Sequence, residues 1–221
     1  MSYKNEFKTC LNNLFESLCD VSDWMYENPE LGFQEFKTSK YLVDYIQNNS
    51  KSVNYPSHGL ETAFDVTFGE EGPLTVICVE YDALPEIGHA CGHNIIATAS
   101  IGAGLGLKDI ATKLGIRVKL LGTPAEEGGG GKIVLINEGA FEDASCSMMI
   151  HPGYEDVVNP TFTTIQQYTI EYFGKDAHAA GAPDQGVNAL DAQIQLFVNA
   201  STYRQQICLL YTSPSPRDNT T

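Results

Sequence analysis

Metal-binding and acid–base side chains gather in one short segment, VEYDALPEIGHACGHN, over residues 79–94. Two carboxylates, two imidazoles and one thiol stand there: Glu80, Asp82, His89, Cys91 and His93. Together they form a borderline-soft ligand set that suits Zn²⁺ and also accepts Mn²⁺ or Co²⁺. The same string fits a loop with a buried cysteine, or a cysteine nucleophile paired with a histidine. By itself the segment leaves these alternatives open.

A second segment, LGTPAEEGGGGK over residues 121–132, contains the adjacent carboxylates Glu126 and Glu127. Two neighbouring carboxylates repel each other, so both stay ionised at close range only beside a cation. With a metal, one of them can be a ligand and the other a general base toward water. An isolated pair of this kind is otherwise typical of a solvated acidic turn.

Two further histidines stand at the ends of short patterns. His151 follows an apolar run in MMIHPG, and His178 lies between alanines in GKDAHAAGAPDQG. Taken alone, the first is typical of a structural histidine and the second of a surface loop.

Hydrophobic periodicity predicts helices over the first ~50 residues, broken near Pro29 and Gly32. Strands and helices then alternate. We expect strands at residues 57–67, 74–79, 116–121 and 146–150, and helices at residues 95–110 and 131–141. This alternation is typical of an α/β fold with a mostly parallel sheet, in which sites form where the strands end.

The composition changes near Asn159 and Pro160, and predicts three regions: residues 1–158, 159–206 and 207–221. The second contains an expected strand, Thr164–Phe173, and a helix, Val187–Tyr203, too little to bury a core. The third ends in CLLYTSPSPRDNTT, which fits either a disordered tail or the translation of a sequencing adapter. We expect the second, so that the natural chain diverges near Gln206 and the 221 residues expose apolar surface and have negligible activity.

The net charge of −15 argues against nucleic acid or an anionic membrane as a partner, because both require clustered Lys and Arg. No stretch approaches the ~20 apolar residues of a bilayer span, and the N-terminus has no signal-like apolar run. A cytoplasmic location is the expectation. Six widely spaced cysteines are then free thiols, apart from a possible metal ligand at Cys91.

Taken in order, these four motifs resemble the M20 family of metallopeptidases and amidohydrolases, in particular its cysteine-containing branch. The strings HACGHN and ETAF are most similar to the M20 domain-containing protein 2 group, which resembles β-alanyl-lysine dipeptidases and aminobenzoyl-glutamate hydrolases. The resemblance implies a three-layer α/β catalytic domain with a mostly parallel sheet. It also implies the start of a smaller α+β lid or dimerisation domain.

The resemblance also implies residue roles. Metal ligands would be Cys91, His93, Glu127 and His151, with Zn²⁺ as the expected metal. Glu126 would be the general base that activates water, and His178 would donate to the oxyanion, often from a partner subunit. Asp82 would orient a ligand imidazole.

Two departures from the family pattern bear on these roles. Asn94 stands where many members of the branch have Asp, and a last ligand histidine belongs to a C-terminal part that these residues do not include. The implied activity is hydrolysis of amide bonds in dipeptides or N-acyl amino acids by a homodimer. The alternatives are a cysteine hydrolase that uses Cys91 with His89 or His93, and an inactive truncated homologue.

Overall fold

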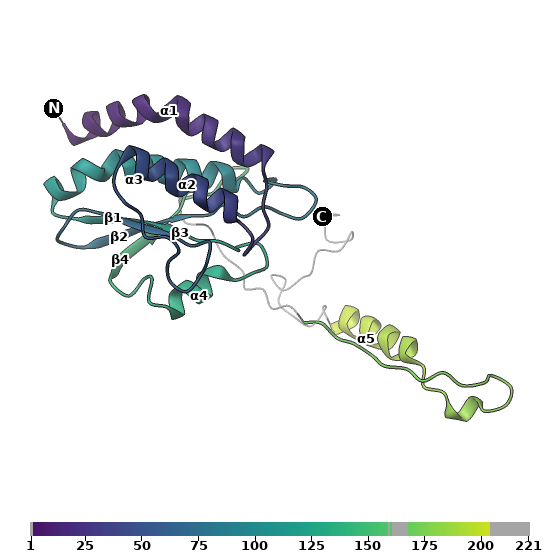
Figure 1. Cartoon of the computed structure of the whole chain (residues 1–221). Helices are drawn as coiled ribbons and strands as arrows, with labels where there is room; N and C mark the ends of the chain where they lie inside the picture. Colours follow the sequence, from purple (N-terminus) through teal and green to yellow (C-terminus); the bar gives the residue numbers. More distant parts are fainter. Residues whose placement is uncertain (1, 159, 161–167, 204–221) are drawn as a thin grey trace. The chain divides into compact units, whose positions relative to one another are not determined.

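The computed structural model describes residues 2–158, 160 and 168–203. Contacts divide the chain into two units, Met1–Glu155 and Asp156–Thr221, which are described separately (Figure 1). The first unit contains the sheet and nearly all of the buried core.

Four strands form the sheet of the first unit: β1 (Asp65–Phe68), β2 (Leu74–Val79), β3 (Arg117–Gly122) and β4 (Ala144–Met148). Their order is β1-β3-β2-β4. The central strand β2 runs parallel to both β3 and β4, and β1 pairs antiparallel with β3 at the edge. The expected α/β class with a mostly parallel sheet is confirmed.

Alternation along β2 and β3 gives the sheet two apolar faces. Ile77, Val79 and Leu120 contribute to the larger core, which includes helices α1 (Tyr3–Glu27), α2 (Phe36–Asn49) and α3 (His93–Leu114). Val76, Cys78 and Leu121 contribute to a smaller core with α4 (Gly131–Asn137) on the opposite face. Figure 1 shows the resulting layers, with α3 between α1 and the sheet and α4 on the far side.

Helix α3 approaches its neighbours closely because glycines line its packing faces. A Cβ at Gly104 would lie 2.6 Å from the side chain of Leu120 in the sheet, and one at Gly106 would lie 2.7 Å from Phe7 in α1. By length and composition α3 could cross a membrane, but 56% of its apolar window is buried within the unit. It is the central core helix of the first unit.

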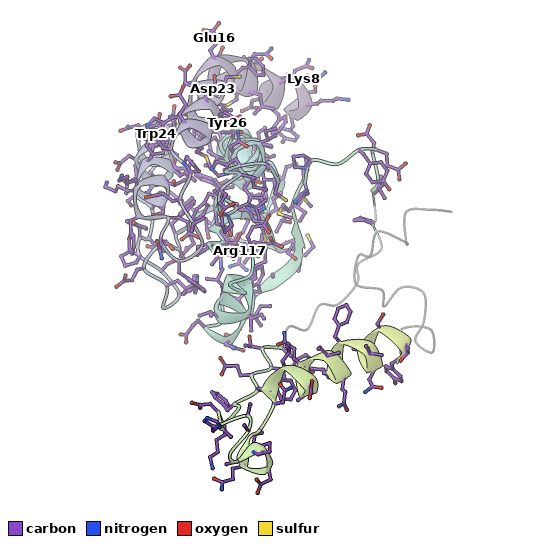
Figure 2. All side chains as sticks on the ribbon, turned by 90° about the vertical axis from the view of Figure 1, so that its right-hand side faces the viewer. Lys8, Glu16, Asp23, Trp24, Tyr26 and Arg117 are labelled. Atoms are coloured by element: carbon purple, nitrogen blue, oxygen red, sulfur yellow. The ribbon has the colours of Figure 1, made fainter. Side chains whose placement is uncertain are left out.

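The N-terminal helix presents a polar outer face. Lys8, Glu16 and Asp23 are exposed along α1 (Figure 2), whereas Val21 and Met25 are buried beneath it. This one-sided burial fits the apolar periodicity from which the helix was predicted.

Some predicted boundaries are wrong. Residues 57–64 form a turn closed by the Ser57 N–H bond to the Ala63 carbonyl, and only residues 65–68 of the expected strand pair with β3. Helix α4 ends at Asn137 because the chain turns there, with Gly139 at positive φ. The last strand is shifted to Ala144–Met148 by its pairing with β2.

The second unit contains an antiparallel bridge between Lys175 and Val187, a 3-10 turn (Pro183–Gln185) and α5 (Ala189–Tyr203). The Asn188 side chain caps α5 by accepting the backbone N–H of Leu190 at 3.0 Å. Of the strand predicted at 164–173, residues 168–173 are described and form no strand, because they pair with no described segment. Residues 164–167 and the tail 207–221 lie outside the described residues.

Candidate metal centre

The chemistry-bearing loops leave the sheet at one edge, because β2, β3 and β4 run parallel and end there together. The loop after β2 contains Cys91 and His93, the loop after β3 contains Glu126 and Glu127, and His151 follows β4. Three loops distant in sequence therefore bring their side chains together.

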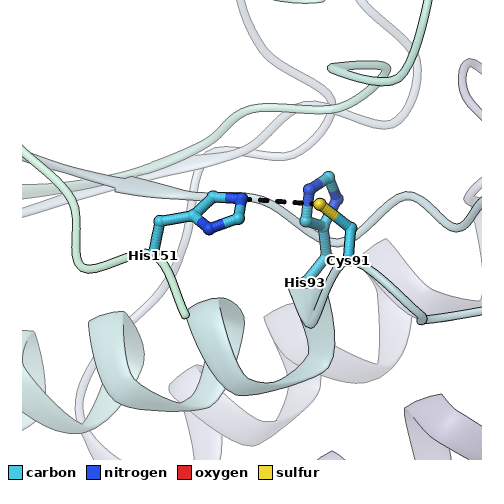
Figure 3. Close-up of side chains that lie close together, drawn as sticks. All are labelled: Cys91, His93 and His151. Atoms are coloured by element: carbon cyan, nitrogen blue, oxygen red, sulfur yellow. Dashed lines mark hydrogen bonds between the residues drawn. The ribbon is translucent and has the colours of Figure 1, made fainter. Parts of the chain in front are cut away.

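One cluster of possible ligands consists of Cys91, His93 and His151, whose donor atoms all lie within 4.8 Å of one another. The Cys91 Sγ atom lies 3.5 Å from Nε2 of His151, and the two imidazole rings meet edge to face with centroids 6.0 Å apart. Figure 3 shows the thiol between the two rings. A metal ion could be held there by soft and borderline donors.

A second cluster shares His93 and adds the two carboxylates Glu126 and Glu127, again with donor atoms within 4.8 Å. The Nε2 atom of His93 lies 3.8 Å from Oε1 of Glu127. Because one imidazole belongs to both groups, the four predicted ligands and the predicted base form one continuous site.

The ring of His93 is oriented from behind by Asp82. Its Nδ1 lies 3.1 Å from Oδ1 of Asp82, and both side chains are buried. With Nδ1–H donating to this carboxylate, Nε2 presents its lone pair to the site. Burial lowers the pKa of His93, but the bond to Asp82 and the charge of Glu80 raise it, and the net direction is upward.

Backbone conformation also shapes the loops. Gly92 precedes α3 at φ 86°, and a Cβ there would lie 2.9 Å from Pro152, so glycine lets the His151 segment approach. Ala125, directly before the two glutamates, has φ 55°, a left-handed conformation that is uncommon for a residue with a Cβ. The backbone N–H of Glu127 then donates to Oδ2 of Asp82 at 2.8 Å.

Negative charge dominates the site. Glu80 is buried and pairs with Lys132 through Oε1, while its Oε2 lies 3.4 Å from His93 Nε2. Burial and the charge of Glu80 raise the pKa of Glu126. Burial and the Glu127 carboxylate raise the pKa of the Cys91 thiol to about 11. Without a further cation, these acidic groups oppose one another's ionisation.

Two buried atoms of the described site lack a hydrogen-bond partner: Nε2 of His93 and Oε2 of Glu80. Unpaired buried polar atoms are costly and uncommon in folded proteins. A divalent cation at the point where thiol, imidazole and carboxylate donors converge would satisfy the imidazole and offset the acidic charge. The residues present therefore fit a metal ion, and their individual roles stay predictions.

Other predicted residues are placed differently. His178 belongs to the second unit, where its Nδ1 accepts the backbone N–H groups of Ala180 and Gly181 at 3.2 and 3.0 Å. His89 is buried with neither ring nitrogen hydrogen-bonded, and burial lowers its pKa to about 4. The thiol of Cys91 contacts His151, not His89, so the structure gives no support to a Cys91–His89 pair.

Reasoning from the sequence missed two residues, Lys132 and Glu35. Lys132 pairs with Glu80, and the only available signal was a lone cation after a run of glycines. Glu35 accepts the backbone N–H of Ala125 from a segment interpreted only as a turn. A carboxylate beside Gly32 and Phe33 carried no pattern that pointed to the site.

No protein-family model matches the chain. It is similar to Xaa-Arg dipeptidase of Mus musculus, 39% identical over 207 residues that cover 87% of this chain and 48% of that enzyme. It is also similar to a p-aminobenzoyl-glutamate hydrolase of Escherichia coli, 31% identical over 78% of this chain and 40% of that protein. The chain spans about half the length of these curated relatives.

Among solved structures, the chain shares its fold with a dinuclear metal-binding peptidase of the M20 family from Bacillus subtilis. The TM-score is 0.54 at 24% identity, over 63% of this chain and 42% of the other.

Proposed function

The chain belongs to the M20 family of peptidases and amidohydrolases, and from this premise we propose that it hydrolyses the amide bond of a dipeptide or an N-acyl amino acid. The observation that carries the proposal is the buried, unpartnered Nε2 of His93, which faces thiol, imidazole and carboxylate donors from three loops. That arrangement is what a hydrolytic metal site requires.

We assign the metal to Cys91, His93, Glu127 and His151. When bound, a divalent metal polarises the amide carbonyl and makes water more acidic. A thiol together with two imidazoles favours Zn²⁺, and Mn²⁺ or Co²⁺ are the alternatives. The two clusters that share His93 leave room for one or two ions.

Glu126 is the general base. It stands next to a ligand but is itself exposed toward solvent, and its raised pKa brings it closer to the working range of a proton shuttle. It takes the proton from the water whose oxygen attacks the amide carbon. As the carbon–nitrogen bond breaks, it gives that proton to the leaving amine.

His178 donates to the oxyanion. Because two backbone N–H groups donate to its Nδ1, the neutral ring must carry its proton on Nε2. That nitrogen is then a ready hydrogen-bond donor toward developing negative charge. We further propose that the active protein is a homodimer in which this donor reaches a site, as the family resemblance implies.

The first substrates to test are dipeptides that end in a basic residue. A relative at 39% identity is named Xaa-Arg dipeptidase, and a net charge of −15 favours cationic over anionic substrates. We also propose a cytoplasmic location, because Cys10, Cys19, Cys78 and Cys146 are free thiols like Cys91 among the described residues.

A direct test combines metal content with hydrolysis. An active preparation should contain about one or two divalent ions per chain, lose activity with a chelator and recover it with Zn²⁺, Mn²⁺ or Co²⁺. A matched set of Ala-Arg, Ala-Lys, Ala-Glu and N-acetyl-arginine ranks the substrates. Hydrolysis that persists in chelator and stops on alkylation of Cys91 would instead favour the cysteine hydrolase.

A further inference from the structure

The turn over residues 28–35, between α1 and α2, lies directly against both loops of the metal site. The carbonyl of Glu30 accepts the backbone N–H of Ala83 at 2.8 Å, next to Asp82. A Cβ added to Gly32 would lie 3.0 Å from the Cα of Ala125. This turn therefore packs beneath the loop after β2 and the loop after β3 at once.

Glu35 stands at the end of this turn, and its side chain is fully buried. Its Oε1 accepts the backbone N–H of Ala125 at 2.8 Å, and its Oε2 accepts the hydroxyl of Thr62 at 2.9 Å. Both of its oxygens are thus used by hydrogen bonds to neutral donors. A buried carboxylate that bonds to no cation is unusual and calls for an explanation.

The residue that Glu35 holds is the one with the left-handed backbone. Ala125 has φ 55°, and the backbone N–H of Gly131 closes the loop by donating to the Ala125 carbonyl at 3.0 Å. A Cβ added to Gly129 would lie 2.7 Å from the Cβ of Ala125, so the loop is tightly folded there. A residue in this conformation keeps it only when its surroundings hold it.

Glu35 also connects to the loop after β2. The carbonyl of Thr62 accepts the hydroxyl of Tyr81 at 2.7 Å, and Tyr81 is fully buried between Glu80 and Asp82 in the sequence. The hydrogen bonds therefore run from the loop before Glu126, through Glu35 and Thr62, to the strand end that carries Asp82.

We propose that Glu35 is a positioning residue, which fixes the turn at Ala125 so that Glu126 and Glu127 face the metal. The inference rests on the proposed function. Two buried carboxylates then hold the glutamate loop from either side, Glu35 at the backbone of Ala125 and Asp82 at the backbone of Glu127. The charge of Glu35 is not what acts; its two acceptor positions are.

Three variants of Glu35 separate this role from general stability. Glu35→Leu removes both acceptors and leaves the Ala125 N–H buried without a partner. Glu35→Asp keeps the carboxylate but is too short to make both bonds. Glu35→Gln keeps a carbonyl for Ala125 and an amide that donates to the Thr62 hydroxyl. A matched control is Ser39→Ala, which removes a buried hydrogen bond to Tyr55 in α2, away from both loops.

The readouts are Co²⁺ affinity, followed by calorimetric titration of the metal-free chain with cobalt chloride, and the absorption spectrum of the Co²⁺–thiolate site. We expect Glu35→Leu and Glu35→Asp to lower the affinity about 10- to 100-fold and to change the spectrum. Glu35→Gln should restore both, and Ser39→Ala should lower thermal stability without changing either.

A folded Glu35→Asp variant with wild-type Co²⁺ affinity and spectrum overturns the inference, even where Glu35→Leu fails to fold. A Glu35→Gln variant as impaired as Glu35→Leu also overturns it, because charge and not hydrogen bonding would then be required. If the wild-type chain itself binds no Co²⁺, the proposed function fails instead, so the two failures are distinguishable.

Discussion

The Oδ1 atom of Asp82 lies 3.1 Å from Nδ1 of His93, and both side chains are almost completely buried. The other oxygen of the same carboxylate accepts the backbone N–H of Glu127 at 2.8 Å. One side chain behind the site thus fixes a ligand imidazole and a ligand carboxylate at once.

Asp82→Asn should therefore lower metal affinity about 10- to 100-fold while the chain stays folded. An amide can accept one of the two bonds, but its NH₂ group must then face the other donor. Calorimetric titration of the metal-free chain measures the change. Asp109→Asn, the same substitution at an exposed position of α3, is the control, and an equal loss there would remove any special role for Asp82.

Glu126 and Glu127 should respond differently to the same change. In an active preparation, Glu126→Gln should leave metal content unchanged and lower kcat by several orders of magnitude, because the amide cannot take a proton from water. Glu127→Gln should lower metal content first. Metal analysis beside steady-state kinetics gives both numbers, and the reverse pattern would exchange the two roles.

Cys91 should be a metal-bound thiolate, so that added Zn²⁺ shields it from alkylation. Cys19 and Cys146 are exposed and lie outside the clusters, and they should react equally with and without metal. Mass spectrometry after a timed iodoacetamide pulse reports each site separately. Equal labelling of Cys91 in both states would exclude it as a ligand.

The buried His89 should make the metal-free chain less stable in acid. Burial lowers its pKa to about 4, below the value of about 6.5 expected in the unfolded chain. Between these values the unfolded chain binds the extra proton, so the free energy of unfolding falls as the pH falls. From pH 6.5 to 5 we expect a loss of about 1 to 2 kcal/mol.

That slope should be absent in His89→Gln, which has no group to titrate there. Urea unfolding at several pH values, in the presence of a chelator, compares the variant with the wild type. His58→Gln is the control, since His58 lies 3.4 Å from Asp65 and not beside the site. An unchanged slope in His89→Gln would show that other groups cause the acid sensitivity.

Position at strand ends made part of the site predictable from the sequence. Cys91, His93, Glu126 and His151 each follow a strand of the parallel sheet, and parallel strands end at the same edge. Their proximity follows from topology once the strands are recognised. Local side-chain types were then enough to propose a metal.

Contacts that join distant segments were not predictable in this way. Glu35 reaches Ala125 across 90 positions through a backbone N–H, which leaves no trace in residue type. The strand expected at residues 57–67 was too long for a related reason. Apolar residues such as Leu60 and Ala63 pack against the smaller core from a turn, so burial there did not require a strand.

Lys132 should act in opposite directions on stability and on metal binding. Its ammonium pairs with the buried carboxylate of Glu80, so Lys132→Met leaves that carboxylate without a cation. Loss of the pair should lower the free energy of unfolding of the metal-free chain by about 1 to 3 kcal/mol. Removal of a positive charge beside the ligands should at the same time strengthen metal binding.

The pH dependence of the reaction gives an independent measure of the same charge. Lys132 lowers the pKa of Glu126, although burial and Glu80 raise it overall, so its removal should raise that pKa further. The base must be deprotonated to act, and the acid limb of kcat/KM should therefore move to higher pH in Lys132→Met. Lys132→Arg keeps the charge and should resemble the wild type in all three measurements. Weaker metal binding in Lys132→Met would mean that Lys132 holds the site together and does not merely balance the charge of Glu80.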